Sequence, residues 1–126
     1  MGPKRPRPVV LDAGALIAIE RADRRMIRLL ELAEELHVPA GALAQAWRNP
    51  ARQVRLVRVV TAEGVVIHPL DDLSAQACGQ LCAATATSDI VDASVVLVAR
   101  QVGGVTLTSD LDDLRRLDPS IDLVRC

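Results

Sequence analysis

The sequence has almost no aromatic side chains: Trp47 is the only Phe, Tyr or Trp in its 126 residues. A row of aromatic side chains stacked on the bases of a single-stranded nucleic acid is therefore excluded. Because half of the residues are hydrophobic, the core must consist of Val, Leu, Ile and Ala, which suits helices packed on buried strands. We interpret Trp47 as a core or half-buried residue, with stacking on a base or anchoring of a partner helix as the alternative.

Cysteine is also scarce, and the three thiols, at Cys78, Cys82 and Cys126, form no even-numbered framework. This argues against a secreted scaffold held together by disulfides. Cys78 and Cys82 are four residues apart on a predicted helix, so they share one face. Since the chain has no C-x-x-C pair and only two histidines, we interpret both thiols as small buried side chains rather than zinc ligands.

The chain lacks a strong charge of either sign, with a formal net charge of −1. No global basic field attracts nucleic acid, so any such contact must come from a local basic surface. The Pro- and Arg-rich segment 1–8 has no apolar stretch of the kind found in a signal peptide, and we expect a flexible tail there, or an arm that contacts phosphates. No hydrophobic run approaches transmembrane length. We therefore expect a cytoplasmic protein without membrane contact, in which residues 9–126 form a single domain.

Short apolar runs alternate with helical patterns along residues 9–126 without a repeat or a linker. Strands are predicted at 9–11, 37–39, 65–67, 105–108 and 121–124. Helices are predicted at 13–20, 23–36, 40–47, 51–61, 71–84, 89–102 and 111–117. This alternation with short loops predicts an α/β fold in which a mostly parallel sheet is flanked by helices on both faces.

Three aspartates stand where predicted strands end and a predicted helix begins. Asp12 ends the first strand, Asp92 lies in the first turn of a late apolar helix, and Asp110 follows the fourth strand. In parallel α/β sheets such ends meet at one edge, where ligands bind and the strand order reverses. Each aspartate alone could simply cap a helix, but this is hardest to argue for Asp92, which is flanked by Val91 and Ala93.

Carboxylates that converge in this way repel one another. Two unit charges about 4 Å apart repel by about 4 kcal/mol at an effective dielectric constant of about 20, so the group either takes up protons or binds a cation. Magnesium suits a site made of oxygen ligands and water, and it can activate water and stabilise charge on a phosphodiester. The pattern therefore predicts metal-dependent hydrolysis of phosphodiester bonds.

Three segments resemble the motifs of PIN domains, and most closely those of VapC-like toxins of type II toxin–antitoxin modules. They are V-V-L-D-A-G-A-L-I-A at residues 9–18, D-A-S-V-V-L-V-A-R at 92–100 and V-T-L-T-S-D at 105–110. The resemblance implies a PIN-like three-layer fold and cleavage of RNA that depends on Mg²⁺ or Mn²⁺. It also implies a homodimer that is inhibited by a cognate antitoxin protein.

The same resemblance implies roles for individual residues. Asp12, Asp92 and Asp110 match the catalytic, metal-binding aspartates of the family. Thr108 would support them by a hydrogen bond to a carboxylate or to a metal-bound water.

One position departs from the family pattern. PIN toxins usually carry a Glu on the helix after the second strand, whereas this chain has Gln45 there. An amide oxygen can still bind a metal or its water, but it brings no negative charge. We expect Asp89 to compensate as a further metal ligand, because it precedes Asp92 by three residues and shares its helix face.

A basic stripe is predicted on the 51–61 helix and just before it. Arg52, Arg55 and Arg58 follow one another at three-residue spacing, and Arg48 precedes them. They suit RNA phosphates, although a solvated helix face explains the spacing as well. The apolar faces of the first two predicted helices could likewise form a groove for an antitoxin helix, or simply pack in the core.

The sequence therefore favours a Mg²⁺-dependent endoribonuclease that acts as the toxin of a toxin–antitoxin module. The alternative is a PIN-like module that binds RNA or a protein but cuts weakly or not at all, which Gln45 favours. A phospho-receiver domain is rejected, because Asp12 is followed by Ala13 and Gly14 rather than by a second acidic residue, and the only lysine is Lys4.

Overall fold

The computed structural model describes residues 7–33 and 35–126, so most of the predicted tail at residues 1–8 lies outside the described residues. Within this part of the chain, five strands form one sheet in the order β3-β2-β1-β4-β5. They are β1 (Val9–Leu11), β2 (Leu36–Pro39), β3 (Val65–His68), β4 (Val105–Thr108) and β5 (Asp122–Arg125). All neighbouring strands run parallel, which confirms the predicted fold class.

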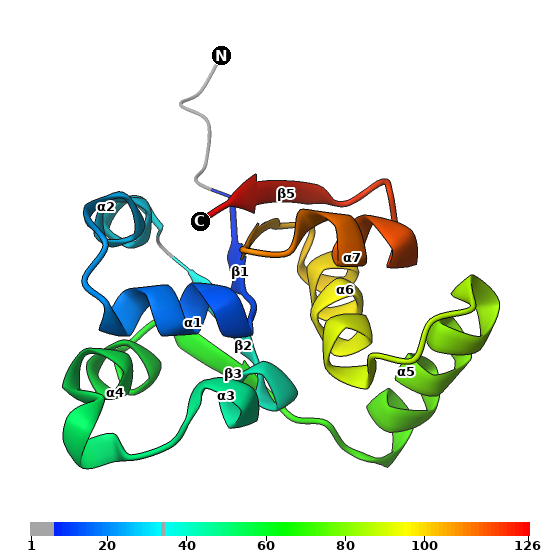
Figure 1. The fold of residues 1–126 in the computed structure, drawn as a ribbon, viewed down its shortest axis with the longest axis horizontal. Helices are drawn as coiled ribbons and strands as arrows, with labels where there is room; N and C mark the ends of the chain where they lie inside the picture. Colours follow the sequence, from blue (N-terminus) through cyan, green and yellow to red (C-terminus); the bar gives the residue numbers. More distant parts are fainter. Residues whose placement is uncertain (1–6, 34) are drawn as a thin grey trace.

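Helices cover both faces of this sheet. They are α1 (Ala13–Glu20), α2 (Arg24–Leu32), α3 (Ala40–Ala46), α4 (Val54–Val60), α5 (Asp72–Thr85), α6 (Ile90–Val102) and α7 (Leu111–Leu117), with a short 3₁₀ turn at Pro50–Arg52. The helices α1 and α4 pack on one face, and α6 and α7 pack on the other, which gives three layers (Figure 1). Because the strand order reverses between β1 and β4, the ligand-binding edge of the fold is expected there.

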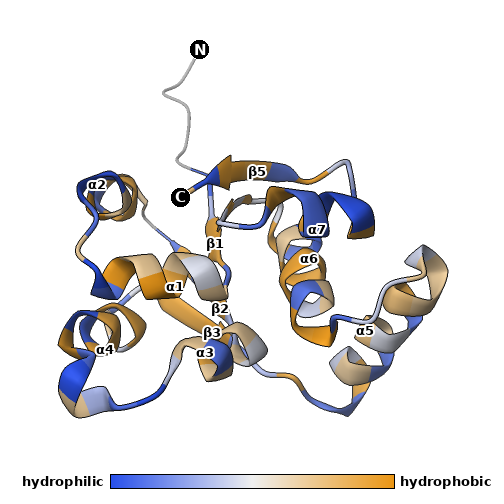
Figure 2. Ribbon diagram, viewed as in Figure 1, coloured by the Kyte–Doolittle hydropathy of each residue, from blue (hydrophilic) through white to orange (hydrophobic). Residues whose placement is uncertain are grey.

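The core consists of the aliphatic side chains that the composition predicted. Leu11 and Leu107 from the central strands, Leu16 from α1 and Val95 from α6 are among its buried members. Figure 2 shows the corresponding hydrophobic colouring along the strands and on the inner sides of the helices. Their burial fixes α1 and α6 on opposite faces of the two central strands, so both helices begin close to the reversal point.

Three residues whose role was uncertain from the sequence belong to this core or its border. Cys78 and Cys82 of α5 are both buried free thiols, which confirms their interpretation as small core residues. Trp47 follows α3 and is half-buried against the core.

The predicted helix at 23–36 is too long. In the structure α2 ends at Leu32, and Leu36 belongs to β2, where its Cα pairs with those of Val9 and Val65. The hydrophobic side chain of Leu36 fits a helical pattern equally well. In a longer helix, however, the backbone N–H and C=O groups of Leu36 would not pair with the neighbouring strands, whose own groups would then lack partners.

The predicted helix at 51–61 is also wrong in extent, because Gln53 interrupts it. Its side-chain oxygen accepts hydrogen bonds from the backbone N–H groups of Arg48 at 2.8 Å and Asn49 at 3.1 Å, and its amide donates to the Ala46 carbonyl at 2.8 Å. The chain therefore forms a 3₁₀ turn before α4 begins at Val54. The last strand is shifted by one residue, to Asp122–Arg125.

The start of the described chain is attached to the sheet. The Arg7 guanidinium pairs with the Asp122 carboxylate at 2.6 Å, and the carbonyl of Pro8 accepts a hydrogen bond from the Val105 N–H at 2.9 Å. In residues 7–33 and 35–126 no single helix is long and apolar enough to cross a membrane; only α5 and α6 together have the length and composition, and they are bent by 104° at their junction.

Candidate metal-binding active site

Four aspartates gather around the reversal point of the sheet. The backbone sets this up, because Leu11 of β1 pairs with Leu107 of β4, and the Asp12 N–H donates to the Leu107 carbonyl at 3.3 Å. The residues that follow these two strands are therefore neighbours. Asp110 precedes α7, and α7 packs against α6, which carries Asp92 in its first turn.

Asp92, Asp110 and Asp113 form the tightest group. Each offers a carboxylate oxygen, and the three oxygens lie within 4.8 Å of one another. Sequence reasoning singled out Asp92 and Asp110 but missed Asp113. The signal was present, since Asp113 follows Asp110 by three residues at the start of a predicted helix and shares its side of that helix.

Asp12 lies behind this group and is only 6% exposed. Its Oδ1 accepts a hydrogen bond from the Ala15 N–H at 2.8 Å, as an N-cap does. Burial nevertheless raises the pKa of Asp12, although hydrogen bonds from the Thr108 hydroxyl and from the backbone of Ala15 and Gly14 oppose the rise. The capping interpretation and the metal interpretation are thus compatible, because capping uses one of several lone pairs.

Thr108 connects Asp12 to the exposed group. Its side chain is fully buried, and its hydroxyl donates to the Asp12 carboxylate. The same Oγ1 accepts a hydrogen bond from the backbone N–H of Asp110 at 2.8 Å. The family resemblance implies that this residue hydrogen bonds to a carboxylate or to a metal-bound water, and that role at a metal stays a prediction.

The carboxylates of the group destabilise one another's charge. Burial, followed by the charges of Asp89, Asp110, Asp113 and Asp12, raises the pKa of Asp92 to about 7. A hydrogen bond with Asp113 is the largest cause that raises the pKa of Asp110. Without a cation, the group therefore retains protons that isolated aspartates lose well below neutral pH.

This donor set fits a hard divalent cation. The available ligands are carboxylate oxygens, which Mg²⁺ and Mn²⁺ prefer. Burial and then the neighbouring carboxylates raise the pKa of Asp92, and such an ion would offset both effects by stabilising the ionised carboxylate. No sulfur or imidazole ligand belongs to the three-residue group, so its chemistry differs from that of a structural zinc site.

Gly14 allows the two strand ends to approach each other. A Cβ atom at this position would lie 2.0 Å from the Ser109 Oγ and 2.9 Å from the Ser109 Cβ. Contacts that short do not occur between real atoms, so only glycine lets the first turn of α1 lie this close to the residue after β4. The close approach brings Asp12 next to the loop that carries Asp110.

The predicted supporting residues occupy different places. Asp89 is the N-cap of α6, where its Oδ1 accepts a hydrogen bond from the Asp92 N–H at 3.0 Å, and its charge contributes to the raised pKa of Asp92. It borders the three-carboxylate group without being one of its members. Gln45 is exposed on α3, which packs against α1 and α6. A metal-binding role for either residue stays a prediction.

The three predicted RNA-binding arginines are exposed but do not form one helical stripe. Arg52 belongs to the 3₁₀ turn and Arg55 to α4. The Arg48 guanidinium donates to the carbonyls of Ala44 at 3.0 Å and Trp47 at 2.7 Å, at the end of α3. Only Arg55 and Arg58 therefore lie three residues apart on the same α-helix. RNA binding by Arg48, Arg52 and Arg55 stays a prediction.

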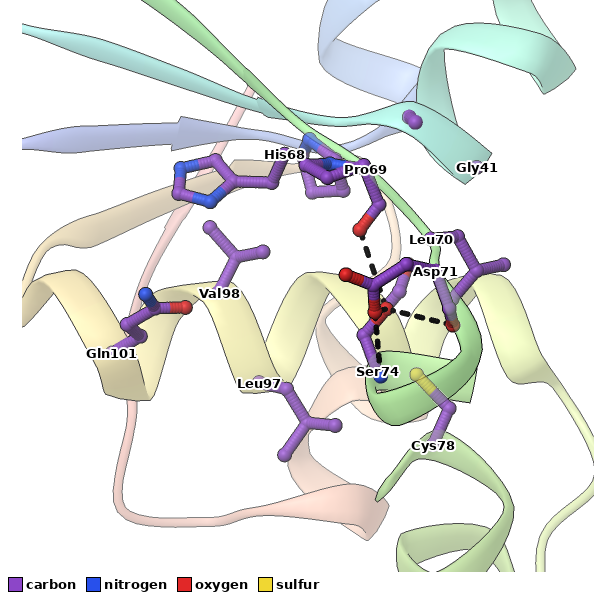
Figure 3. Close-up of a pocket in the computed structure, with 13 residues that line it drawn as sticks. Gly41, His68, Pro69, Leu70, Asp71, Ser74, Cys78, Leu97, Val98 and Gln101 are labelled. Atoms are coloured by element: carbon purple, nitrogen blue, oxygen red, sulfur yellow. Dashed lines mark hydrogen bonds between the residues drawn. The ribbon is translucent and has the colours of Figure 1, made fainter. Parts of the chain in front are cut away.

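A separate hollow lies along α6, between the ends of β2 and β3 and the helices α5 and α6 (Figure 3). Its volume is about 290 Å³, and its walls include His68, Asp71, Ser74 and Gln101. In Figure 3 the side chains of Asp71 and Ser74 hydrogen bond to each other. None of the three grouped carboxylates lines this hollow, so it is separate from the candidate metal site.

The protein is thus a parallel three-layer α/β domain with carboxylates at the reversal point of its sheet. No family model and no curated protein matches the chain, but solved structures match nearly all of it. VapC20 from Mycobacterium tuberculosis, described as a sarcin-ricin loop cleaving toxin, has a TM-score of 0.71 at 15% identity, covering 94% of this chain and 99% of that chain.

Two further structures have the same fold. VapBC2 from Rickettsia felis, solved with a DNA fragment from its promoter, has a TM-score of 0.71 at 14% identity and covers 94% of this chain and 98% of that chain. FitAcB from Neisseria gonorrhoeae has a TM-score of 0.60 at 14% identity, covering 91% and 95%. The chain therefore has the PIN-like fold of VapC-like toxins, as its three motifs predicted.

Proposed function

We propose that this protein is a metal-dependent endoribonuclease and the toxin of a type II toxin–antitoxin module. The observation that carries the proposal is the approach of the Asp92, Asp110 and Asp113 carboxylates to within 4.8 Å at the reversal point of a PIN-like fold. VapC20, which shares the fold, cleaves the sarcin-ricin loop, and this supports RNA as the substrate here.

In this proposal Asp92, Asp110 and Asp113 hold Mg²⁺ or Mn²⁺, and Asp12 supplies further negative charge from its buried position. When bound, the ion would lower the pKa of water and stabilise negative charge on the phosphodiester. The chain's own contribution is to hold the carboxylates in place. Thr108 contributes by its hydrogen bonds to the Asp12 carboxylate and to the backbone N–H of Asp110, which would orient Asp12 and position the loop that carries Asp110 before the substrate arrives.

The test is a titration of Mg²⁺ and Mn²⁺ into the antitoxin-free protein while cleavage of a mixed RNA pool is followed. We expect cleavage only in the presence of an ion. Asp113→Asn should weaken ion binding by at least about tenfold, since even residues that only hydrogen bond to a metal's ligands contribute that much to affinity. Asp112→Asn is the matched control, because Asp112 neighbours Asp113 but lies outside the group.

The alternative is a PIN-like module that binds RNA or a protein without cutting. It is supported if the purified wild-type protein binds neither ion and leaves every RNA intact. Asp89→Asn examines whether Asp89 compensates for Gln45, because asparagine preserves the N-cap of α6 and removes only the charge. If Asp89→Asn leaves both ion affinity and cleavage unchanged, Asp89 is a cap and nothing more.

The proposed protein partner is a small antitoxin that inserts an apolar helix. On α1 and α2 the side chains of Ile17, Ile27 and Leu32 are exposed, and large apolar side chains in such a position suit the helix-in-groove mode of recognition. Ile17→Asp should release a co-expressed antitoxin while the toxin keeps its fold. We also propose a homodimer, on the resemblance alone, and sedimentation of the antitoxin-free protein tests it.

A further inference from the structure

A polar hollow adjoins the carboxylate group on the side of α5 and α7. Its volume is about 470 Å³, and Asp92 and Asp113 form part of its wall. The end of α5 contributes Thr85, the link between α5 and α6 contributes Thr87 and Ser88, and α7 contributes Arg116. The helices α5, α6 and α7 lie together on one side of the sheet (Figure 1), so three elements enclose the hollow.

The charges around the hollow are unequal. Asp89, Asp92 and Asp113 all line it, and Arg116 is the one cationic side chain among its lining residues. An RNA strand brings a negative charge with every phosphate, so a strand that enters here meets repulsion that a metal ion offsets at one point only. A cationic side chain on the same wall would offset the repulsion between these carboxylates and the neighbouring phosphate of the strand.

Arg116 is free to make such a contact. Its guanidinium lies 4.0 Å from the Asp113 carboxylate, at the limit of an ion pair, and its side chain is 73% exposed. A pair this open contributes little to stability, so little is lost when the guanidinium turns towards a phosphate. The planar guanidinium can also bind two phosphate oxygens at once, which a lysine cannot do.

We propose that Arg116 is a positioning residue that binds a phosphate of the RNA strand, next to the scissile one, in the hollow between α7 and the α5–α6 link. This proposal rests on the proposed nuclease function and adds the path of the substrate to it. Ser88 and the hydrogen-bonded pair Thr85 and Thr87, whose hydroxyl oxygens are 3.0 Å apart, line the same hollow, where they would offer the polar contacts to ribose and unstacked bases that RNA recognition uses.

The experiment compares Arg116→Ala, Arg116→Lys and Arg115→Ala. Arg115 is the matched control, because it is exposed on the same helix but does not line the hollow. Cleavage kinetics are measured with Mg²⁺, and binding of a short labelled mixed-sequence RNA is measured without divalent ions as the salt concentration rises. We expect Arg116→Ala to raise KM about tenfold, with kcat changed far less, and to reduce the salt slope of binding by about one phosphate contact.

Arg116→Lys should have the salt slope of wild type and a KM between those of wild type and Arg116→Ala. Arg115→Ala should behave as wild type. The proposal is overturned if the two alanine variants are alike, or if Arg116→Ala lowers kcat at unchanged KM, which would mean that Arg116 acts on the carboxylates instead. A wild-type protein that cuts no RNA refutes the nuclease function, and the salt slope then still decides whether Arg116 binds phosphate. The unfolding midpoint of each variant reports any loss of structure.

Discussion

The Oγ1 atom of Thr108 accepts a hydrogen bond from the backbone N–H of Asp110 at a distance of 2.8 Å. Because the same hydroxyl donates to Asp12, one buried side chain links Asp12 to the loop that carries Asp110. A threonine at the end of a central strand would ordinarily be explained by its β propensity alone. Here its buried hydroxyl also hydrogen bonds to the Asp12 side chain and to the Asp110 backbone.

This relationship predicts that Thr108→Val destabilises the protein and weakens its metal site. Valine has nearly the same shape but leaves the Asp110 N–H without its partner and removes a hydrogen bond from Asp12, which should cost about 1–3 kcal/mol. Chemical denaturation measures the stability, and calorimetry measures Mg²⁺ affinity. Thr108→Ser is the control, since it keeps the hydroxyl. Equal losses in Thr108→Ser and Thr108→Val would show that the methyl group matters and the hydrogen bonds do not.

A second prediction concerns pH and Asp92. The folded state raises the pKa of Asp92 to about 7 from its ordinary value of 3.8, so the folded protein binds more protons than the unfolded chain between these values. The contribution of Asp92 to stability is therefore fully present below pH 4 and is lost as the pH rises through 7. Without divalent ions, Asp92→Asn should be more stable than wild type at pH 8, by about 1 kcal/mol after allowance for solvent screening of the half-buried carboxyl.

The gain should vanish at low pH, where the wild-type carboxyl is protonated, and saturating Mg²⁺ should reverse it by stabilising only the wild type. Urea unfolding at several pH values measures this, with Asp112→Asn as the control. If Asp92→Asn is instead less stable than wild type at pH 8 without divalent ions, attractive contacts stabilise the ionised Asp92 carboxylate, and they outweigh its burial and its repulsion by the other carboxylates.

A third prediction concerns Gly14. Alanine at this position would place its Cβ 2.0 Å from the Ser109 Oγ, and relief of that clash should cost about 1–3 kcal/mol of stability. The double variant Gly14→Ala with Ser109→Gly removes the obstructing side chain and should recover most of the loss. Thermal unfolding measures both variants.

Gly79 supplies the contrast. It lies inside α5, and apart from its chain neighbours and the adjacent backbone of that helix no atom lies within 4 Å of a Cβ atom placed there. Gly79→Ala should therefore stabilise the protein by about 0.5–1 kcal/mol through the higher helix propensity of alanine. If Gly14→Ala proves as harmless as Gly79→Ala, the close approach of α1 to the end of β4 is wrong.

A fourth prediction concerns the histidine pair on the neighbouring strands β2 and β3. His37 of β2 hydrogen bonds to His68 of β3 through Nδ1 and Nε2 at 2.7 Å, and to Glu35 through its other ring nitrogen. Burial and the neighbouring His37 lower the pKa of His68 below its ordinary 6.5. Stability from this pair is therefore present above pH 6.5 and is lost as the pH falls through the folded pKa of His68.

Comparison with His68→Asn isolates the effect, because the raised pKa of Asp92 acts in the opposite direction over the same pH range. The difference in unfolding free energy between wild type and variant should shrink by at most about 1 kcal/mol from pH 7.5 to 5, since His68 is largely solvated. A difference that is constant over this range would show that protonation of His68 does not act on the fold.

Much of the fold follows from the sequence. The five strands were predicted because apolar runs of Val, Leu and Ile stand between turn residues, and both ends of α6 because Asp89 caps it and Gly103 closes it. The errors at Leu36 and Gln53 share a cause. The side chain of Leu36 suits a helix and a strand equally well. Gln53 interrupts the helix only because its side chain hydrogen bonds to the backbone of residues that precede it. Neither choice is visible in the local pattern.

By itself the sequence determined the α/β alternation and put Asp12, Asp92 and Asp110 at element ends, because periodicity and capping are local properties of the chain. Only the tertiary structure decided that Asp113 approaches Asp92, that Asp12 is buried behind them, and that Arg116 shares a hollow with both members of that pair. The physical reason is that side-chain distances across separate helices depend on how those helices pack on the sheet, which no spacing within one helix encodes.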